Sequence, residues 1–97
     1  MPQWTRSSTS DTAAQPKGKA SVGTSSAELL APNRKRIAAY ITNRGASRVW
    51  LALGPTAAKE EGIMLNPEGG NAVIDNYTGE ITAIAEGASN LVTFSEI

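Results

Sequence analysis

Cationic side chains are concentrated in one part of this 97-residue chain. Five of them lie close together in the sequence, namely Arg34, Lys35, Arg36, Arg44 and Arg48. Cations of this kind contact phosphates, and the nearby rings of Tyr40 and Trp50 could stack on bases. The pI near 6.2 argues against a nonspecific nucleic-acid binder, and both rings would suit a protein core or a subunit contact equally well. The pattern therefore favours a protein partner, with a nucleic-acid-binding β-barrel as an alternative.

Catalytic and metal-binding residues are scarce. The chain has no histidine and no cysteine, which removes the usual zinc and haem ligands and the common Cys/His catalytic groups. Glu60 and Glu61 are adjacent, so on an extended chain they point to opposite sides, whereas a glycosidase needs two carboxyl groups aimed at one bond. We expect no enzymatic activity, no catalytic residue, no cofactor and no bound metal.

The charges are divided unevenly along the chain. Residues 1–50 hold eight cations and two carboxylates, a net charge of +6, whereas residues 51–97 hold one cation and seven carboxylates, a net charge of −6. Complementary halves indicate self-association or docking to a charged neighbour. A solvated surface of mixed charges is the alternative.

The chain after residue 19 has the pattern of short β-strands separated by turns. Apolar residues alternate in 36–43, where Ile37, Ala39 and Ile41 share one face, and in 48–53, where Val49, Leu51 and Leu53 share one face and Trp50 points to the other. Residues 44–47 are expected to join these runs as an antiparallel hairpin, and residues 87–90 to join 80–87 and 90–97 as a closing hairpin. Residues 55–62 are expected to form a loop or a single turn. The pattern predicts an all-β fold, a small antiparallel β-sandwich or jelly-roll-like barrel of seven or eight strands.

The first 19 residues differ from the rest in composition. They are rich in Ser, Thr, Ala, Pro and Gly, and Trp4 is the large apolar residue among them. Such a segment buries too little surface to order itself. We expect an extended N-terminal arm over residues 1–19, in which Trp4 and Arg6 contact a partner, followed by a β-sandwich domain over residues 20–97.

Several short motifs occur in a fixed order along the domain. They are the Pro-Asn-Arg-Lys run at 32–35, the Asn-Arg-Gly turn at 43–45, Gly-Ile-Met-Leu at 62–65, Pro-Glu-Gly-Gly at 67–70, Tyr-Thr-Gly at 77–79 and a final strand that ends near Glu96. In this order the chain, from residue 20 to 97, resembles the small β-barrel or sandwich structural proteins of tailed bacteriophages. The resemblance implies a virion structural role, in capsid decoration or cement or as a minor head or tail component. It supplies no catalytic residues.

The expected function follows from these observations together. We expect a non-enzymatic virion protein, made in the host cytoplasm, that binds the major capsid protein or other virion subunits. The expected partner-binding residues are Trp4, Arg6, Arg34, Lys35, Arg36, Arg44 and Arg48. Homo-oligomerisation is expected as well, and the family analogy implies a trimer. No apolar run approaches the roughly 20 residues of a membrane span, so no membrane partner is expected. A carbohydrate-binding virion module is a further alternative.

Overall fold

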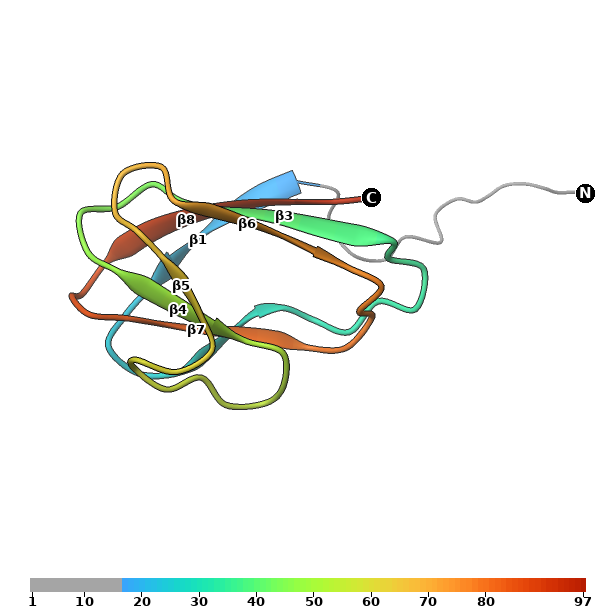
Figure 1. Ribbon diagram of the computed structural model, residues 1–97, viewed down its shortest axis with the longest axis horizontal. Helices are drawn as coiled ribbons and strands as arrows, with labels where there is room; N and C mark the ends of the chain where they lie inside the picture. The colour runs from blue at the N-terminus through green and yellow to red at the C-terminus, as the bar shows by residue number, and fades with distance from the viewer. Residues whose placement is uncertain (1–16) are drawn as a thin grey trace, which may run out of the picture.

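The structure is a computed structural model that describes residues 17–97, and these form eight β-strands (Figure 1). The strands are β1 (Lys17–Val22), β2 (Ala27–Leu30), β3 (Ala38–Asn43), β4 (Val49–Ala52), β5 (Ile63–Leu65), β6 (Asn71–Asp75), β7 (Ile81–Ala85) and β8 (Asn90–Glu96). Within residues 17–97 there is no helix that could cross a membrane.

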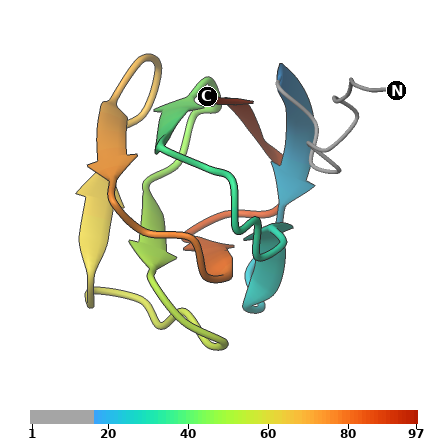
Figure 2. The same ribbon diagram turned by 90° about the vertical axis from the view of Figure 1, so that its right-hand side faces the viewer.

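The strands form two four-stranded sheets stacked as two layers (Figures 1 and 2). The first sheet has the order β1-β8-β3-β6 and the second has the order β2-β7-β4-β5. All paired strands are antiparallel. The predicted all-β sandwich is therefore confirmed, with eight strands.

Both predicted hairpins are wrong, because the strands that they join lie in different sheets. β3 pairs with β6 and β8, whereas β4 pairs with β5 and β7. In the same way, β7 pairs with β2 and β4, whereas β8 pairs with β1 and β3. Each predicted turn instead carries the chain from one layer to the other. Among the described strands, only β4 and β5 are consecutive neighbours in one sheet, and the loop of residues 53–62 joins them.

Two buried asparagine side chains hold the crossing from β3 to β4. Asn43 donates from Nδ2 to the carbonyl oxygens of Ser47 (2.8 Å) and Leu65 (3.1 Å). Its Oδ1 accepts from the Gly45 N–H (3.0 Å) and from Asn90 Nδ2 (2.6 Å). Asn90 Oδ1 in turn accepts from the Ser47 N–H (2.9 Å). The amides thus bind backbone groups of Gly45 and Ser47, in the turn that carries the chain from β3 to β4.

The core lies between the layers and follows the predicted alternation of side chains. The largest fully buried apolar residues come from both sheets: Ile41, Val49, Leu51, Leu65, Ile81 and Val92. Ile37 departs from the prediction that it shares the inward face of Ala39 and Ile41. It precedes the first residue of β3, and 66% of it is exposed. Leu53 likewise departs from the predicted face of Val49 and Leu51, because β4 ends at Ala52 and 46% of Leu53 is exposed.

The first strand starts earlier than the predicted domain. β1 begins at Lys17 and pairs with β8 along its whole length, from Lys17 opposite Ser95 to Val22 opposite Asn90. Lys17, Gly18 and Lys19, which were expected in the arm, therefore belong to the first sheet. Trp4, Arg6 and the rest of the predicted arm before residue 17 lie outside the described residues.

Candidate partner-binding surface

The basic turn between β2 and β3 is held in place by its backbone. The Asn33 N–H donates to the Thr78 carbonyl (2.8 Å), and the Arg36 N–H donates to the Asn33 carbonyl (3.0 Å). Asn33 Oδ1 also accepts from the Lys35 N–H (3.1 Å). The turn therefore has a fixed position, and it exposes the side chains of Arg34 and Lys35.

Arg36, in contrast, points into the protein. Its Nε donates to Glu96 Oε2 at 2.7 Å, and the two side chains are 0% and 4% exposed. Nη1 donates to the carbonyl oxygens of Tyr77 (3.1 Å) and Gly79 (3.0 Å), and Nη2 donates to that of Ala31 (2.7 Å). The expectation that Arg36 binds a partner is wrong for this reason. Its guanidinium is buried and occupied by groups of its own chain.

The hydrogen bonds of Arg36 join three parts of the sandwich at one end. Glu96 ends β8, Ala31 follows β2, and Tyr77 and Gly79 lie between β6 and β7. The Tyr77 hydroxyl donates to the Glu80 carbonyl (2.9 Å) and so fixes the same connection. Arg36 is therefore a structural residue that positions Arg34 and Lys35.

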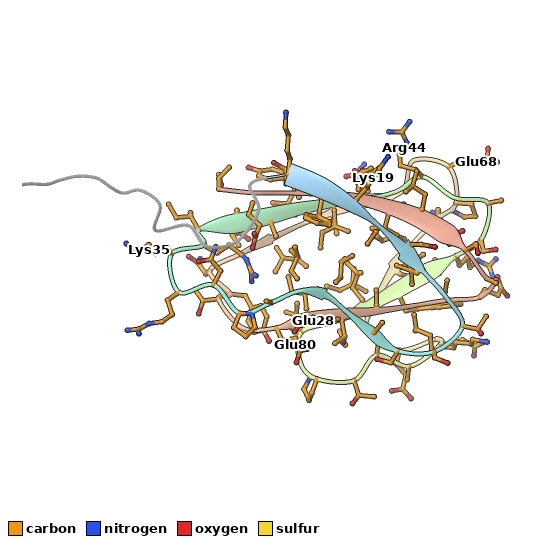
Figure 3. All side chains as sticks on the ribbon, turned by 180° about the vertical axis from the view of Figure 1, so that it is seen from behind. Lys19, Glu28, Lys35, Arg44, Glu68 and Glu80 are labelled. Atoms are coloured by element: carbon orange, nitrogen blue, oxygen red, sulfur yellow. The ribbon has the colours of Figure 1, made fainter. Side chains whose placement is uncertain are left out.

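The remaining cations do not form a single basic corner. Arg34 and Lys35 precede β3, whereas Arg44 and Arg48 follow it. A strand of six residues spans about 20 Å, and Figure 3 shows Lys35 and Arg44 at opposite ends of the molecule. The structure thus separates the predicted basic residues into two pairs.

Two exposed isoleucines lie at the same end as Arg34 and Lys35. The Ile97 carbonyl accepts from the N–H groups of Ile37 (2.6 Å) and Ala38 (3.2 Å). The Ile97 N–H also donates to the Ala38 carbonyl (2.9 Å), so Ile97 pairs with Ala38. The backbone bonds bring Ile37 and Ile97 to the same end of the sandwich, and these residues are 66% and 59% exposed. We call Arg34, Lys35, Ile37 and Ile97 the terminal patch. The sequence pattern missed its apolar part because it assigned Ile37 to the core.

The two rings that could stack on a ligand have different environments. Tyr40 is 44% exposed on the outer side of the first sheet, whereas Trp50 is 5% exposed. Trp50 packs with Ala57 and Ile84 beneath the loop of residues 53–62. That loop is anchored by hydrogen bonds from the Ala57 N–H to Ser26 Oγ (2.8 Å) and from Thr82 Oγ1 to the Gly54 carbonyl (2.9 Å). Trp50 therefore cannot serve as a stacking platform.

The same loop borders a hollow of about 400 Å³. The hollow is lined mainly by apolar groups, with Thr56 and Glu61 as its polar members, and the lining residues are Leu51, Ala52, Leu53, Thr56, Ala58, Glu61, Gly62 and Ile63. Only one carboxylate lines it, so a two-carboxylate hydrolytic site does not form there.

A pair of carboxyl groups lies on the second sheet. Glu28 and Glu80 are neighbours (Figure 3), and a hydrogen bond between their side chains raises the pKa of Glu80, with smaller contributions from desolvation and from repulsion by Glu28. Within residues 17–97, no three or more acidic side chains gather as ligands for a metal ion. Glu28 therefore favours the protonated form of Glu80. Two carboxyl groups alone are too few ligands for a hard cation such as Ca²⁺ or Mg²⁺.

Comparisons with protein-family models, with curated proteins and with solved structures found no match to this chain.

Proposed function

We propose that this protein is a non-enzymatic structural protein of a bacteriophage virion, which decorates or cements the capsid. The observation that carries the proposal is the strand order, β1-β8-β3-β6 in one sheet and β2-β7-β4-β5 in the other. This is the order of the eight-stranded jelly roll, a fold that viral capsid domains and lectins share. A fold hosts many functions, so the proposal also needs a surface that could bind a virion subunit.

The terminal patch provides such a surface. It combines two exposed isoleucines with two exposed cations, a composition that suits a partner with an apolar contact surrounded by acidic residues. The start of β1 lies nearby, because Lys17 pairs with Ser95, two residues before Ile97. Trp4 and Arg6 could then bind the same partner beside the patch.

The strength of attachment would come from repetition. An exposed ion pair contributes only about 0 to 1 kcal/mol, so Arg34 and Lys35 alone would hold a subunit weakly. A large aromatic residue buried at an interface contributes more to the binding free energy. We therefore assign the main anchor to Trp4. Many copies on a regular lattice would add further avidity.

Capsids assembled without this protein provide the test. Purified chain should sediment with them, and Trp4→Ala and Ile37→Ser should each reduce the bound amount several-fold. Arg44→Ala combined with Arg48→Ala, at the opposite end, is the matched control and should bind as the unchanged chain does. Failure of the unchanged chain to bind capsids would refute the proposal, and loss of binding in the control alone would move the contact to the other end.

Carbohydrate binding is a second candidate, because one observation favours it. The exposed Tyr40 ring lies in register with Ser95 on β8 and next to the pair formed by Thr42 and Thr93, and an aromatic ring surrounded by hydroxyl groups suits a sugar. Binding on a glycan array that Tyr40→Ala abolishes would support this candidate over capsid attachment.

A further inference from the structure

The hollow of about 400 Å³ beside the loop of residues 53–62 uses none of the residues of the terminal patch. One of its walls comes from the ends of β4 and β5, where Leu51 lies directly opposite Ile63. The other wall comes from the loop itself, which leaves β4 and returns to β5 (Figure 1). The volume lies within the range of about 300 to 1,000 Å³ that is common for small-molecule sites.

The backbone fixes the shape of this hollow. Gly62 has φ of 85° and lies so close to β4 that a Cβ would collide with the Leu51 carbonyl oxygen. The Glu61 N–H donates to the Ala58 carbonyl (3.3 Å), and the two hydrogen bonds described above anchor the rest of the loop. The hollow is therefore preformed, so a ligand would not have to order the loop before it binds.

Two polar side chains, Glu61 and Thr56, line the otherwise apolar hollow. A carboxylate accepts hydrogen bonds and donates none, and a hydroxyl group can accept as well. Glu61 is exposed, and within residues 17–97 it has no ion-pair partner. The hollow thus combines apolar walls with one unpaired negative charge.

This combination selects one class of ligand. An anion would be repelled by Glu61, and most hydroxyl groups of a sugar would face apolar walls without a hydrogen-bond partner. A neutral apolar molecule would fill the hollow but leave the charge of Glu61 unused. An ammonium group has three donors and no acceptor, so it matches the carboxylate and the hydroxyl group together.

We propose that the hollow binds a small primary ammonium ion with an apolar tail, such as an alkylammonium ion. The tail lies against Leu53, which is 46% exposed in the free protein, and against Ile63. The ammonium group donates to the Glu61 carboxylate and to the Thr56 hydroxyl. Because an exposed ion pair is weak and is screened by salt, binding is expected in the millimolar range and decreases as salt is added. This inference goes beyond capsid attachment, since it assigns a ligand to a different site.

Titration with hexylammonium chloride, followed by NMR of the methyl-labelled full chain, tests the site. The methyl resonances of Leu53 and Ile63 should shift and reach saturation. Those of Leu91 and Ile97, which are also exposed but do not line the hollow, should stay in place. Hexanoate and 1-hexanol have the same tail without the positive charge, and each should bind at least several-fold more weakly.

Three variants separate the charge of the site from its apolar walls. Glu61→Gln should weaken binding of hexylammonium several-fold and leave binding of 1-hexanol unchanged. Glu60→Gln is the matched control, because it removes the same charge from an adjacent exposed residue that does not line the hollow, and it should bind as the unchanged chain does. Leu53→Ala should weaken binding of both ligands. Thermal melting of each variant establishes that it is folded.

Three outcomes would overturn the proposal. One is the absence of a saturable shift with hexylammonium at low salt. Another is equal weakening by Glu61→Gln and Glu60→Gln, which would show attraction to the general negative charge of the loop. The third is tighter binding of a short peptide that carries one lysine and is blocked at both ends, which would assign the hollow to a lysine side chain of a partner protein. All titrations use the purified chain without capsids, so failure of capsid attachment leaves their result unaffected.

Discussion

At the residue scale, the ion pair between Arg36 and Glu96 joins distant connections at one end of the sandwich. A buried pair of this kind is weak evidence for net stability, because desolvation offsets much of the attraction. Removal of one partner is costly, however, since it leaves the other charge buried alone. Among residues 17–97, Glu96 Oε1 has no hydrogen-bond partner, and Arg36 Nε donates to Glu96 Oε2.

Arg36→Ala should therefore lower the free energy of unfolding by about 3 to 5 kcal/mol. Arg34→Ala, two residues away and exposed, is the matched control and should change it by less than about 0.5 kcal/mol. Urea denaturation of both variants measures the difference. Equal stabilities would contradict the structural role assigned to Arg36 and would return it to the set of partner-binding residues.

The pair of Glu28 and Glu80 predicts a dependence of stability on pH. Hydrogen bonding to Glu28 raises the pKa of Glu80 above its ordinary value of 4.5, so the folded protein binds this proton more tightly than the unfolded chain does. The resulting stability is present below pH 4.5 and is lost as the pH rises through the raised pKa. The melting temperature of the unchanged chain should thus rise relative to that of Glu80→Gln as the pH falls from 7 to 4.5. Parallel curves for the two proteins would refute this effect.

At the element scale, the sequence predicts strand content well and strand partners poorly. Alternation of apolar residues identified the inward faces of β3 and β4, because burial on one side imposes a period of two. The same pattern carries no information on which sheet a strand joins. The turn after Asn43 looks like a hairpin turn, but Asn43 and Asn90, from strands 47 positions apart in the sequence, bind its backbone. A contact of that separation is set by the tertiary structure.

Asn43→Ala should be strongly destabilising. The substitution leaves the Gly45 N–H and the carbonyls of Ser47 and Leu65 without their partner, and each buried polar group left unsatisfied costs about 1 to 3 kcal/mol. Asn71→Ala, whose side chain makes an exposed bond to its own turn, serves as the control. Chemical denaturation should separate the variants by at least about 2 kcal/mol, and a smaller gap would contradict the role of the amide pair.

The loop of residues 53–62 depends on one glycine. Gly62 has φ of 85°, and a Cβ at this position would collide with the Leu51 carbonyl oxygen. Gly62→Ala should therefore destabilise the protein by about 1 to 3 kcal/mol, with increased Trp50 fluorescence quenching by acrylamide as the loop loosens. Gly54→Ala in the same loop is the control, because a Cβ there meets nothing within 4 Å. Equal effects of the two substitutions would show that neither backbone strain nor the collision matters.

At the scale of the whole molecule, the structure separates cations that are close together in the sequence. Neighbours in sequence such as Lys35 and Arg36 point in different directions, one to solvent and one to Glu96. Arg44 lies at the far end of β3 from both. The outer side of the first sheet could not be predicted for a related reason. Its residues come from β1, β8, β3 and β6, whose order in the sheet follows from pairings between distant parts of the chain.

The boundary between the N-terminal segment and the sandwich predicts different effects of two N-terminal deletions on thermal stability. In the described part of the chain, β1 begins at Lys17, and Lys17, Gly18 and Lys19 pair with Ser95, Phe94 and Thr93 of β8. Deletion of residues 1–16 should thus leave the melting temperature unchanged. Deletion of residues 1–19 removes half of β1 and should lower it, by about 4 to 8 °C for each kcal/mol lost in a domain of this size.

The two deletions also separate folding from attachment. Under the proposed function, both should reduce sedimentation with capsids, because both remove Trp4, but only the longer one should change the thermal transition. Calorimetry and capsid sedimentation on the same preparations measure the two effects. A lowered transition after the shorter deletion would mean that residues before Lys17 stabilise the sandwich, and unchanged capsid binding would mean that Trp4 is not the anchor.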